Sequence, residues 1–316
     1  MLVVSTTKLG DQLEKKLTDQ YPALIFKFFK NIKEANTLIK EMDILMTFGE
    51  DLTDDDIYRA TKLKWIMVLS AGVDQMPFKA IQERGIVITN ARGIHKVPMA
   101  EYAIAMLLNY YRQNLQFAHQ QAEKRWDKSI PTREISGRTM TIVGAGAIGE
   151  ELARLAKAFY MTTYAVTNSG GSRPYFDQVF KNDSVKAALA QADFVVSILP
   201  STPSTKGYYQ AEHFEAMKQD AVFLNMGRGD AVTEKVLLHA LDTNQIEHAI
   251  LDVTEIEPLP EDSPIWSHGK ITLTPHISGK SAHYLSRAMV IFEQNLDHFL
   301  KGKSLPINQI DPARGY

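Results

Sequence analysis

Three glycines, Gly144, Gly146 and Gly149, have the spacing G-x-G-x-x-G, which can bind the phosphates of a dinucleotide. A β-branched run, Thr139–Val143, precedes them and is typical of a buried strand, and residues 150–159 follow with helical spacing. In that setting Gly144 makes the tight turn and Gly146 lets a pyrophosphate approach the backbone. Gly149 then lets the helix pack closely on the strand, with its N-terminus facing the phosphates. The segment is predicted to be a nucleotide-binding strand–turn–helix unit.

Three polar side chains, Arg228, Glu257 and His276, each follow closely on a later predicted strand. In an open α/β sheet the carboxyl ends of the strands converge on one crevice, where the reactive ring of a bound cofactor would lie. Taken singly, each has an ordinary explanation: a surface arginine, a loop carboxylate and a hydrogen-bonded core histidine. Their coincidence on the strand ends of one nucleotide-binding sheet indicates a catalytic site.

A further turn, made by Ser70, Ala71, Gly72, Val73 and Asp74, directly follows a predicted strand in the first third of the chain. Ligands of open α/β sheets bind beyond the strand ends, and successive backbone N–H groups in such a turn can form an anion-binding nest. The alternative is an ordinary strand-to-helix turn without a ligand.

Strand-like and helix-like segments alternate along the whole chain, which predicts an α/β fold of parallel sheets with helices on their faces. A helix over residues 97–121 is apolar around much of its circumference, so it is expected to be buried in a core or between subunits. The predicted strands are 2–5, 24–29, 43–48, 65–69, 86–89, 139–143, 162–166, 194–199, 221–225, 248–252 and 271–274. The other predicted helices are 11–18, 76–83, 150–159, 184–191, 211–217, 234–244 and 282–301.

The composition limits the class of protein. A chain of 316 residues is long enough for two domains, and a net charge of −2 does not favour nucleic acid or an anionic membrane as a partner. The absence of cysteine excludes disulfides, thiolate catalysis and Cys-ligated metal sites, and no metal site is expected. The first residues have no signal-peptide pattern and no apolar stretch is long enough to span a bilayer, so a cytoplasmic location without a membrane is expected.

The sequence resembles the D-isomer-specific 2-hydroxyacid dehydrogenase family, and its glyoxylate/hydroxypyruvate reductases in particular. The resemblance rests on five motifs in the family's order, and residues 90–101 resemble the entry to the family's dimerisation helix. The motifs are at 143–149, 199–205, 225–230, 251–260 and 274–279.

The resemblance implies two doubly wound parallel-sheet domains and a homodimer. A Rossmann NAD(P)-binding domain, residues 96–279, would be inserted into a flavodoxin-like substrate domain made of residues 1–95 and 280–316. Because the chain would cross between the domains twice, closure of a cleft on the cofactor is expected.

The resemblance also implies the role of each site residue. Arg228 would hold the carboxylate and carbonyl oxygen of the substrate, for which its planar fork is suited. His276 would protonate the carbonyl oxygen as hydride arrives from the nicotinamide, and Glu257 would pair with His276 and favour its protonated form. The turn at Ser70, Ala71, Gly72 and Val73 would bind the substrate carboxylate through backbone N–H groups. Related formate dehydrogenases carry glutamine in place of Glu257, so this residue favours a 2-keto acid.

The choice between nicotinamide cofactors depends on the second strand of the nucleotide-binding unit. NAD-specific sites place an acidic residue about 20 positions after the glycines, to bind the ribose 2′-hydroxyl. Here Thr167, Asn168 and Ser169 stand there without a carboxylate, and Arg173 follows. NADP(H) is therefore predicted to be preferred, with NAD(H) as the alternative if Thr167 or Asn168 replaces the acid.

Asp252 resembles the family residue that contacts the nicotinamide carboxamide. The predicted cofactor-binding residues are Gly144, Gly146, Ala147, Ile148, Gly149, Thr167, Asn168, Ser169, Arg173, Pro200, Thr205, Met226, Gly227, Arg228, Asp252, His276 and Gly279.

The main hypothesis is the reduction of a small 2-keto acid to a D-2-hydroxy acid, with glyoxylate, hydroxypyruvate, pyruvate and longer analogues as candidates. The side-chain pocket is expected around residues 46–50 and 70–73, with further lining from the helix at 97–121 of a partner subunit, and Phe48 and Met76 indicate an apolar lining. One alternative is a nucleotide-sensing regulatory protein on the same fold, against which the complete Arg228, Glu257 and His276 set argues. The other is a phosphoglycerate dehydrogenase, which is the less favoured expectation because many such enzymes carry an additional C-terminal regulatory domain and none is expected here.

Overall fold

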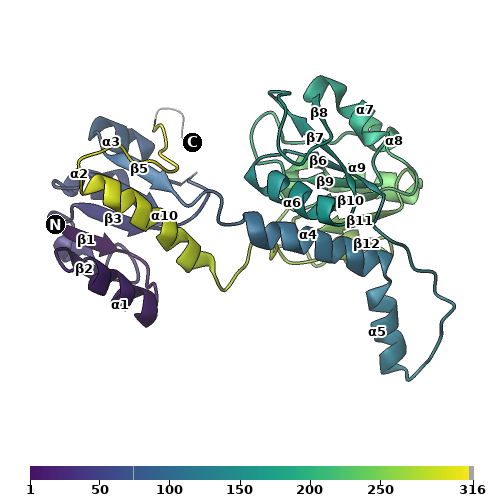
Figure 1. Cartoon of the computed structure of the whole chain (residues 1–316), viewed down its shortest axis with the longest axis horizontal. Helices are drawn as coiled ribbons and strands as arrows, with labels where there is room; N and C mark the ends of the chain where they lie inside the picture. Colours follow the sequence, from purple (N-terminus) through teal and green to yellow (C-terminus); the bar gives the residue numbers. More distant parts are fainter. Residues whose placement is uncertain (74, 313–316) are drawn as a thin grey trace. The chain divides into compact units, whose positions relative to one another are not determined.

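In a computed structural model the chain forms two compact units, and the structure describes residues 1–73 and 75–312. The first unit comprises Met1–Ile94 and Ser281–Tyr316, and the second comprises His95–Lys280 (Figure 1). Asp74 of the predicted turn and residues 313–316 of the predicted C-terminal segment lie outside the described residues. The second unit is thus an insertion into the first.

The first unit contains a five-stranded parallel sheet in the order β2-β1-β3-β4-β5, which is the flavodoxin-like order. The helix α10 (Tyr284–Phe299) packs on this sheet, because Trp65 of β4 stacks on Phe292 with ring centroids 5.2 Å apart. The strands are β1 (Leu2–Ser5), β2 (Ile25–Phe28), β3 (Ile44–Thr47), β4 (Trp65–Val68) and β5 (Val87–Asn90). The other helices are α1 (Asp11–Gln20), α2 (Asp54–Arg59) and α3 (Phe78–Glu83).

The second unit contains a seven-stranded parallel sheet in the order β12-β11-β10-β9-β6-β7-β8. Counted from β6, this is the Rossmann order with one more strand at the β12 edge, and the strand order reverses between β6 and β9. The strands are β6 (Thr139–Val143), β7 (Thr162–Thr167), β8 (Gln178–Lys181), β9 (Phe194–Ser197), β10 (Val222–Asn225), β11 (His248–Leu251) and β12 (Ile271–Leu273). The helices are α4 (Lys96–Tyr111), α5 (Asn114–Ala122), α6 (Ala147–Ala158), α7 (Val185–Leu189), α8 (Ala211–Glu215) and α9 (Glu234–Asp242).

A hydrophobic core covers each face of the second sheet. Side chains alternate along β9, so Val195 joins the cluster under α7, α8 and α9, while Phe194 and Val196 join the cluster under α4 and α6. Both faces of the central strands are therefore buried, as is typical of a parallel sheet. The prediction of doubly wound parallel sheets is confirmed.

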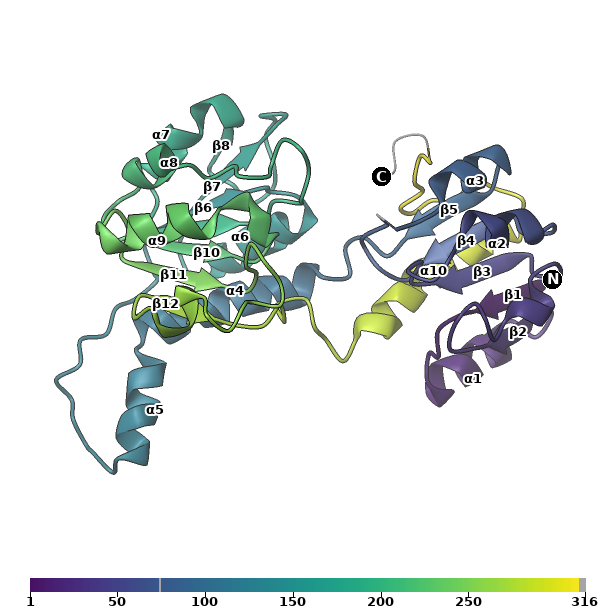
Figure 2. The same ribbon diagram turned by 180° about the vertical axis from the view of Figure 1, so that it is seen from behind.

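The single helix predicted over residues 97–121 is wrong. Gln113 has the left-handed backbone conformation, with φ of 57°, and this residue separates α4 from α5. The apolar side of α4, including Ala103 and Leu107, packs into the core of its own unit. Figures 1 and 2 show α5 and the connection back to β6 extending away from the sheet, and Leu115 and Trp126 are 62% and 89% exposed there.

Among the α-helices and strands of the described residues, α2 and β8 are absent from the sequence-based prediction. Apart from α4 and α5, which were predicted as one helix, the others lie within a few residues of their predicted bounds. Strand β8 has exposed or half-buried side chains throughout, so it lacks the apolar run that marks its neighbours. None of the helices in residues 1–73 and 75–312 is long and apolar enough to cross a membrane.

Candidate active site

The glycine-rich turn between β6 and α6 has the close contacts that its glycines imply. Gly144 has φ of +89°, and a Cβ there would lie 2.8 Å from the carbonyl oxygen of Ile198. A Cβ at Gly149 would lie 3.0 Å from Cγ2 of Ile142, so α6 sits directly against β6. A Cβ at Gly146, which precedes the first turn of α6, would meet no atom within 4 Å. The space in front of Gly146 and the amide groups of the helix N-terminus fit a pyrophosphate.

The end of strand β7 forms a small polar platform. The Thr167 hydroxyl oxygen accepts a hydrogen bond from the amide of Gly170 at 3.1 Å, and Asn168 accepts one from the side chain of Asn182. Ser169 is exposed, and Nε of Arg173 is buried with no hydrogen-bond partner among the described residues. The residues predicted to receive the ribose therefore do share one loop, and no carboxylate stands among them.

Lys181 also belongs to this platform, although the sequence analysis did not include it. It is the last residue of β8 and pairs in register with Thr167 of β7. Its side chain crosses Gly170, where an added Cβ would lie 2.7 Å from Cγ of the lysine. The only available signal was the cation itself, since β8 was not recognised as a strand.

The loop after β9 is fixed by Thr205. Its hydroxyl donates to the carbonyl oxygen of Pro200 and lies 2.8 Å from the amide nitrogen of Thr202, which donates to it. The side chain of Met226 is buried in the core below α4, so only backbone atoms of Met226 and Gly227 are available to a ligand.

Arg228 follows β10 between two glycines that cannot be replaced without movement. A Cβ at Gly227 would lie 2.5 Å from the carbonyl oxygen of Leu199, and a Cβ at Gly229 would lie 1.8 Å from that of Thr254. The backbone on each side of Arg228 is thus pressed against a neighbouring loop. Nη1 of Arg228 donates to the carbonyl oxygen of Gly227 at 3.0 Å.

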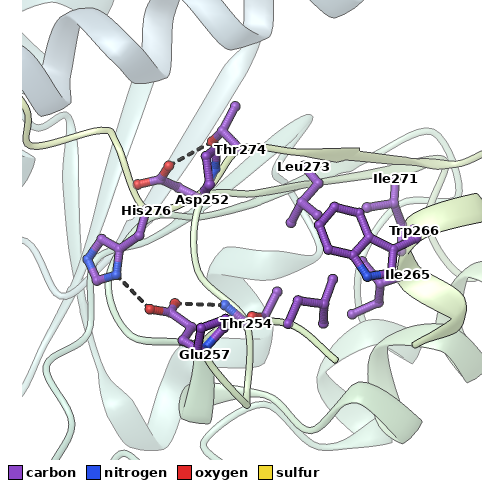
Figure 3. A pocket seen from close by; sticks show the side chains of 12 residues that line it. Asp252, Thr254, Glu257, Ile265, Trp266, Ile271, Leu273, Thr274 and His276 are labelled. Carbon is purple, nitrogen blue, oxygen red and sulfur yellow. Dashed lines mark hydrogen bonds and ion pairs between the residues drawn. The ribbon is translucent and has the colours of Figure 1, made fainter. Parts of the chain in front are cut away.

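His276 and Glu257 follow the adjacent strands β12 and β11 and are in contact. Nδ1 of His276 lies 2.8 Å from Oε2 of Glu257, and Oε1 of Glu257 accepts the amide of Thr254 at 3.1 Å (Figure 3). His276 has a left-handed backbone with φ of 52°, which is uncommon outside glycine and is often found at functional sites. With Nδ1 held by the carboxylate, Nε2 is the ring nitrogen left for proton transfer.

Asp252 holds the loop that carries His276. Its side chain is 1% exposed; Oδ1 accepts the Thr274 hydroxyl at 2.7 Å and the Ile277 amide at 2.8 Å. Oδ2 accepts the amide of Ser278 at 2.9 Å, and the backbone carbonyl of Asp252 accepts the amide of His276 at 2.8 Å. Both carboxylate oxygens are therefore already engaged by the chain itself, which the sequence analysis did not foresee.

A cavity of about 870 Å³ opens beside this pair. Figure 3 shows the His276–Glu257 contact on one side of it and the ring of Trp266 with apolar neighbours on the other. The apolar wall consists of Leu259, Ile265, Trp266, Ile271 and Leu273.

His95, the first residue of the second unit, is a further neighbour of the site that the sequence analysis missed. Its Nδ1 lies 3.3 Å from the carbonyl oxygen of Gly279, and a Cβ on that glycine would lie 2.9 Å from the same nitrogen. Burial lowers the pKa of His95, the hydrogen bond to Gly279 opposes this, and the charge of Arg228 lowers the pKa further. His95 thus links the Arg228 and Gly279 ends of the site.

In the first unit, the turn after β4 has its carbonyls engaged. Asn90 donates to the carbonyl of Ala71 at 2.7 Å, and Ser70 donates its hydroxyl to that of Gly72 at 2.7 Å. The amides of residues 71–73 donate to no acceptor among the described residues, so they are available to an anion. A cavity of about 220 Å³ lies at this turn and is lined by Phe48, Gly49, Glu50, Ser70, Gly72, Val73, Gln75 and Met76.

The sequence profile of the D-isomer specific 2-hydroxyacid dehydrogenase NAD-binding domain matches residues 104–278. The chain belongs to this family. Membership confirms the resemblance drawn from the motifs and, with it, the class of NAD(P)-dependent oxidoreductases.

Solved and curated relatives agree with the family. A D-isomer specific 2-hydroxyacid dehydrogenase family protein from Aeromonas salmonicida is 36% identical, with a TM-score of 0.85 and coverage of 98% of both chains. A D-isomer specific 2-hydroxyacid dehydrogenase from Xanthobacter autotrophicus, solved in complex with NADPH and MES, is 25% identical, with a TM-score of 0.78 and full coverage of both chains. The D-3-phosphoglycerate dehydrogenase of Methanocaldococcus jannaschii is 31% identical over 84% of this chain, which spans only 51% of that longer protein.

Proposed function

We propose that this family member reduces a small 2-keto acid to the D-2-hydroxy acid with a nicotinamide cofactor. The observation that carries the proposal is the contact between His276 and Glu257 on adjacent strand ends of a Rossmann sheet, 2.8 Å apart. In this proposal the second unit binds the cofactor and carries Arg228, Glu257 and His276.

When bound, the reduced nicotinamide supplies the hydride. His276 then donates the proton on Nε2 to the carbonyl oxygen, while Glu257 orients the ring through Nδ1. Arg228 binds the substrate carboxylate and carbonyl oxygen through its planar fork. The amides of residues 71–73, which donate to no acceptor among the described residues, fit an anion within the first unit. In the reverse direction His276 is the base.

NADP(H) is the cofactor that we propose to be preferred. The end of β7 offers the hydroxyl of Thr167, the amide of Asn168 and the exposed Ser169 where an NAD-specific site has a carboxylate. The buried Nε of Arg173 lacks a partner in the same loop. These groups fit a 2′-phosphate and would not repel one.

A phosphoglycerate dehydrogenase function is the second candidate because such an enzyme is among the relatives. The cavity in the first unit argues against it, since its described lining residues include a carboxylate, Glu50, and no cation. A substrate phosphate would need a cationic partner there. An unphosphorylated keto acid such as glyoxylate, hydroxypyruvate or pyruvate is the better match.

A homodimer is the proposed assembly. The apolar side of α4 is used within its own unit, but Leu115 on α5 and Trp126 after it are largely exposed. Light scattering on the purified protein should give twice the mass of the 35.5 kDa chain. A monomer at micromolar concentration would refute this assembly.

The function is tested by the loss of nicotinamide absorbance with NADH and with NADPH across a panel of 2-keto acids. Turnover that His276→Ala abolishes would establish the reductase, and the best pair would identify the cofactor and substrate class. Cofactor binding without reduction of any keto acid would instead favour a nucleotide sensor.

A further inference from the structure

Strand β8 brings a lysine to the predicted ribose site. Lys181 ends β8 directly beside Thr167, the last residue of β7, and its aliphatic chain lies across Gly170. Cγ, Cε and Cδ of Lys181 would lie 2.7, 2.8 and 3.3 Å from a Cβ at Gly170. Only a glycine leaves room for the lysine to lie over the turn.

The ammonium group of Lys181 is unpaired in the part of the chain that the structure describes. No ion pair or hydrogen bond joins it to another residue within 1–73 and 75–312. The single carboxylate between Thr167 and Lys181 is Asp177, which binds Lys157 and the amide of Thr163. Thr163 is at the other end of β7, four residues or about 13 Å from Thr167.

The loop that the lysine covers is held in place by side chains of neighbouring segments. Asn168 accepts a hydrogen bond from Asn182, and Asn182 accepts one from the Tyr208 hydroxyl at 3.2 Å. Because Asn182 follows Lys181 directly, the turn after β7 and the end of β8 form one connected surface. This surface presents a cation at the position where Rossmann sites distinguish the two nicotinamide cofactors.

We propose that Lys181 is the residue that selects NADP(H), by binding the 2′-phosphate from strand β8 across Gly170. A lysine is a compact cation that binds phosphate without the bidentate geometry of arginine. The preference for NADP(H) thus depends on a residue outside the turn after β7. The inference rests on the proposed function only in requiring a nicotinamide cofactor.

The test is calorimetric titration with adenosine 2′,5′-bisphosphate and with adenosine 5′-monophosphate, which differ only in the 2′-phosphate. The wild-type protein should bind the bisphosphate at least about tenfold more tightly. Lys181→Ala should weaken the bisphosphate about tenfold and change the monophosphate less than twofold, whereas Lys181→Arg should keep most of the difference. Lys186→Ala is the matched control, because that lysine is paired with Glu212 at 2.8 Å and should have no effect.

Equal binding of the two nucleotides to the wild type, or an unchanged ratio in Lys181→Ala, would overturn the inference. The readout is independent of turnover. If the bisphosphate binds as expected but no keto acid is reduced, the reductase proposal fails and the Lys181 inference stands. If keto acids are reduced with NADH and the bisphosphate binds no more tightly than the monophosphate, the reductase proposal stands and the Lys181 inference fails.

Discussion

Nδ1 of His276 lies 2.8 Å from Oε2 of Glu257, while Oε1 of the same carboxylate accepts the Thr254 amide at 3.1 Å. The carboxylate is therefore fixed by the backbone at one oxygen and orients the imidazole with the other. The ring of His276 is half exposed, and Nε2 is the nitrogen that the carboxylate does not contact. A histidine oriented in this way can donate a proton without the entropy cost of first ordering its side chain.

His276→Ala should lower kcat by about 10²- to 10⁴-fold, which is the usual contribution of a positioned acid. Glu257→Gln places an amide near Nδ1 of His276 that can present its NH2 group instead of an acceptor, so the ring loses its fixed orientation. Its kcat should therefore fall by about tenfold or more, with little change in KM for the keto acid. NADPH binding to Glu257→Gln, followed by fluorescence, should stay within about twofold of wild type. A wild-type kcat in this variant would show that the pair is not functional.

Asp252→Asn tests whether the position of the loop that carries His276 affects kcat independently of the stability of the fold. Because Asn presents only one acceptor oxygen, one of the amides of Ile277 and Ser278 loses its partner, at a cost of about 1–3 kcal/mol. We expect kcat to fall about tenfold or more, with a smaller change in KM for the keto acid, because the loop carrying His276 shifts.

Asp193→Asn is the matched control for Asp252→Asn. Asp193 is also a buried carboxylate, 7% exposed, that accepts a backbone amide, from Thr139 at 2.7 Å. The control should lower the free energy of unfolding with little change in kcat. Equal kcat losses in the two variants would indicate only a general loss of structure.

The cavity at the turn after β4 should discriminate by charge. Hydroxypyruvate should be reduced more efficiently than 3-phosphohydroxypyruvate, because Glu50 lines the cavity and none of the described lining residues is cationic. Glu50→Lys should raise kcat/KM for the phosphorylated acid relative to hydroxypyruvate by about tenfold or more. The same charge change at Glu83, on α3 and outside the cavity lining, should not. A wild-type preference for the phosphorylated acid would support a phosphoglycerate dehydrogenase.

His248 should make the folded state sensitive to acid. Its ring stacks on Tyr110 with centroids 4.0 Å apart, and burial lowers its pKa from 6.5 to about 4, with smaller contributions from His268 and Arg133. Since the unfolded chain takes up the proton first, the free energy of unfolding should decrease as the pH falls from 6.5 to about 4. The total contribution is at most about 3 kcal/mol.

Urea titrations across this pH range would measure the effect of His248. His248→Gln removes the titrating group, so its unfolding free energy should depend less steeply on pH than that of the wild type. Parallel curves for the two proteins would contradict the assignment.

Most of the fold could be predicted from the sequence because the helices and strands are marked by patterns among residues close together in the chain. The order of strands and helices and the glycine contacts at Gly144 and Gly149 follow from apolar periodicity and backbone sterics. The break at Gln113 could not be predicted in this way, because nothing in its residue type marks the end of a helix and only its left-handed backbone separates α4 from α5. Strand β8 was missed because its side chains are not buried.

The candidate site was predictable in its residue types but not in its internal contacts. Strand ends pointed to Arg228, Glu257 and His276, and the structure brings the last two together. The hydrogen bonds of Asp252 to residues 25 and 26 positions later depend on the course of one loop, which no local pattern specifies. Lys181 reaches the polar platform at the end of β7 only through the pairing of β8 with β7.

The glycines on either side of Arg228 limit how this enzyme could be altered. With the carbonyls of Leu199 and Thr254 within 2.5 and 1.8 Å of any added Cβ, neither Gly227 nor Gly229 can acquire a side chain without displacing backbone. The backbone around Arg228 is therefore held in one position, and changes in substrate range are expected at residues outside 227–229. Directed evolution of this chain should accordingly collect its specificity changes in the segment around Glu50 and leave residues 227–229 untouched.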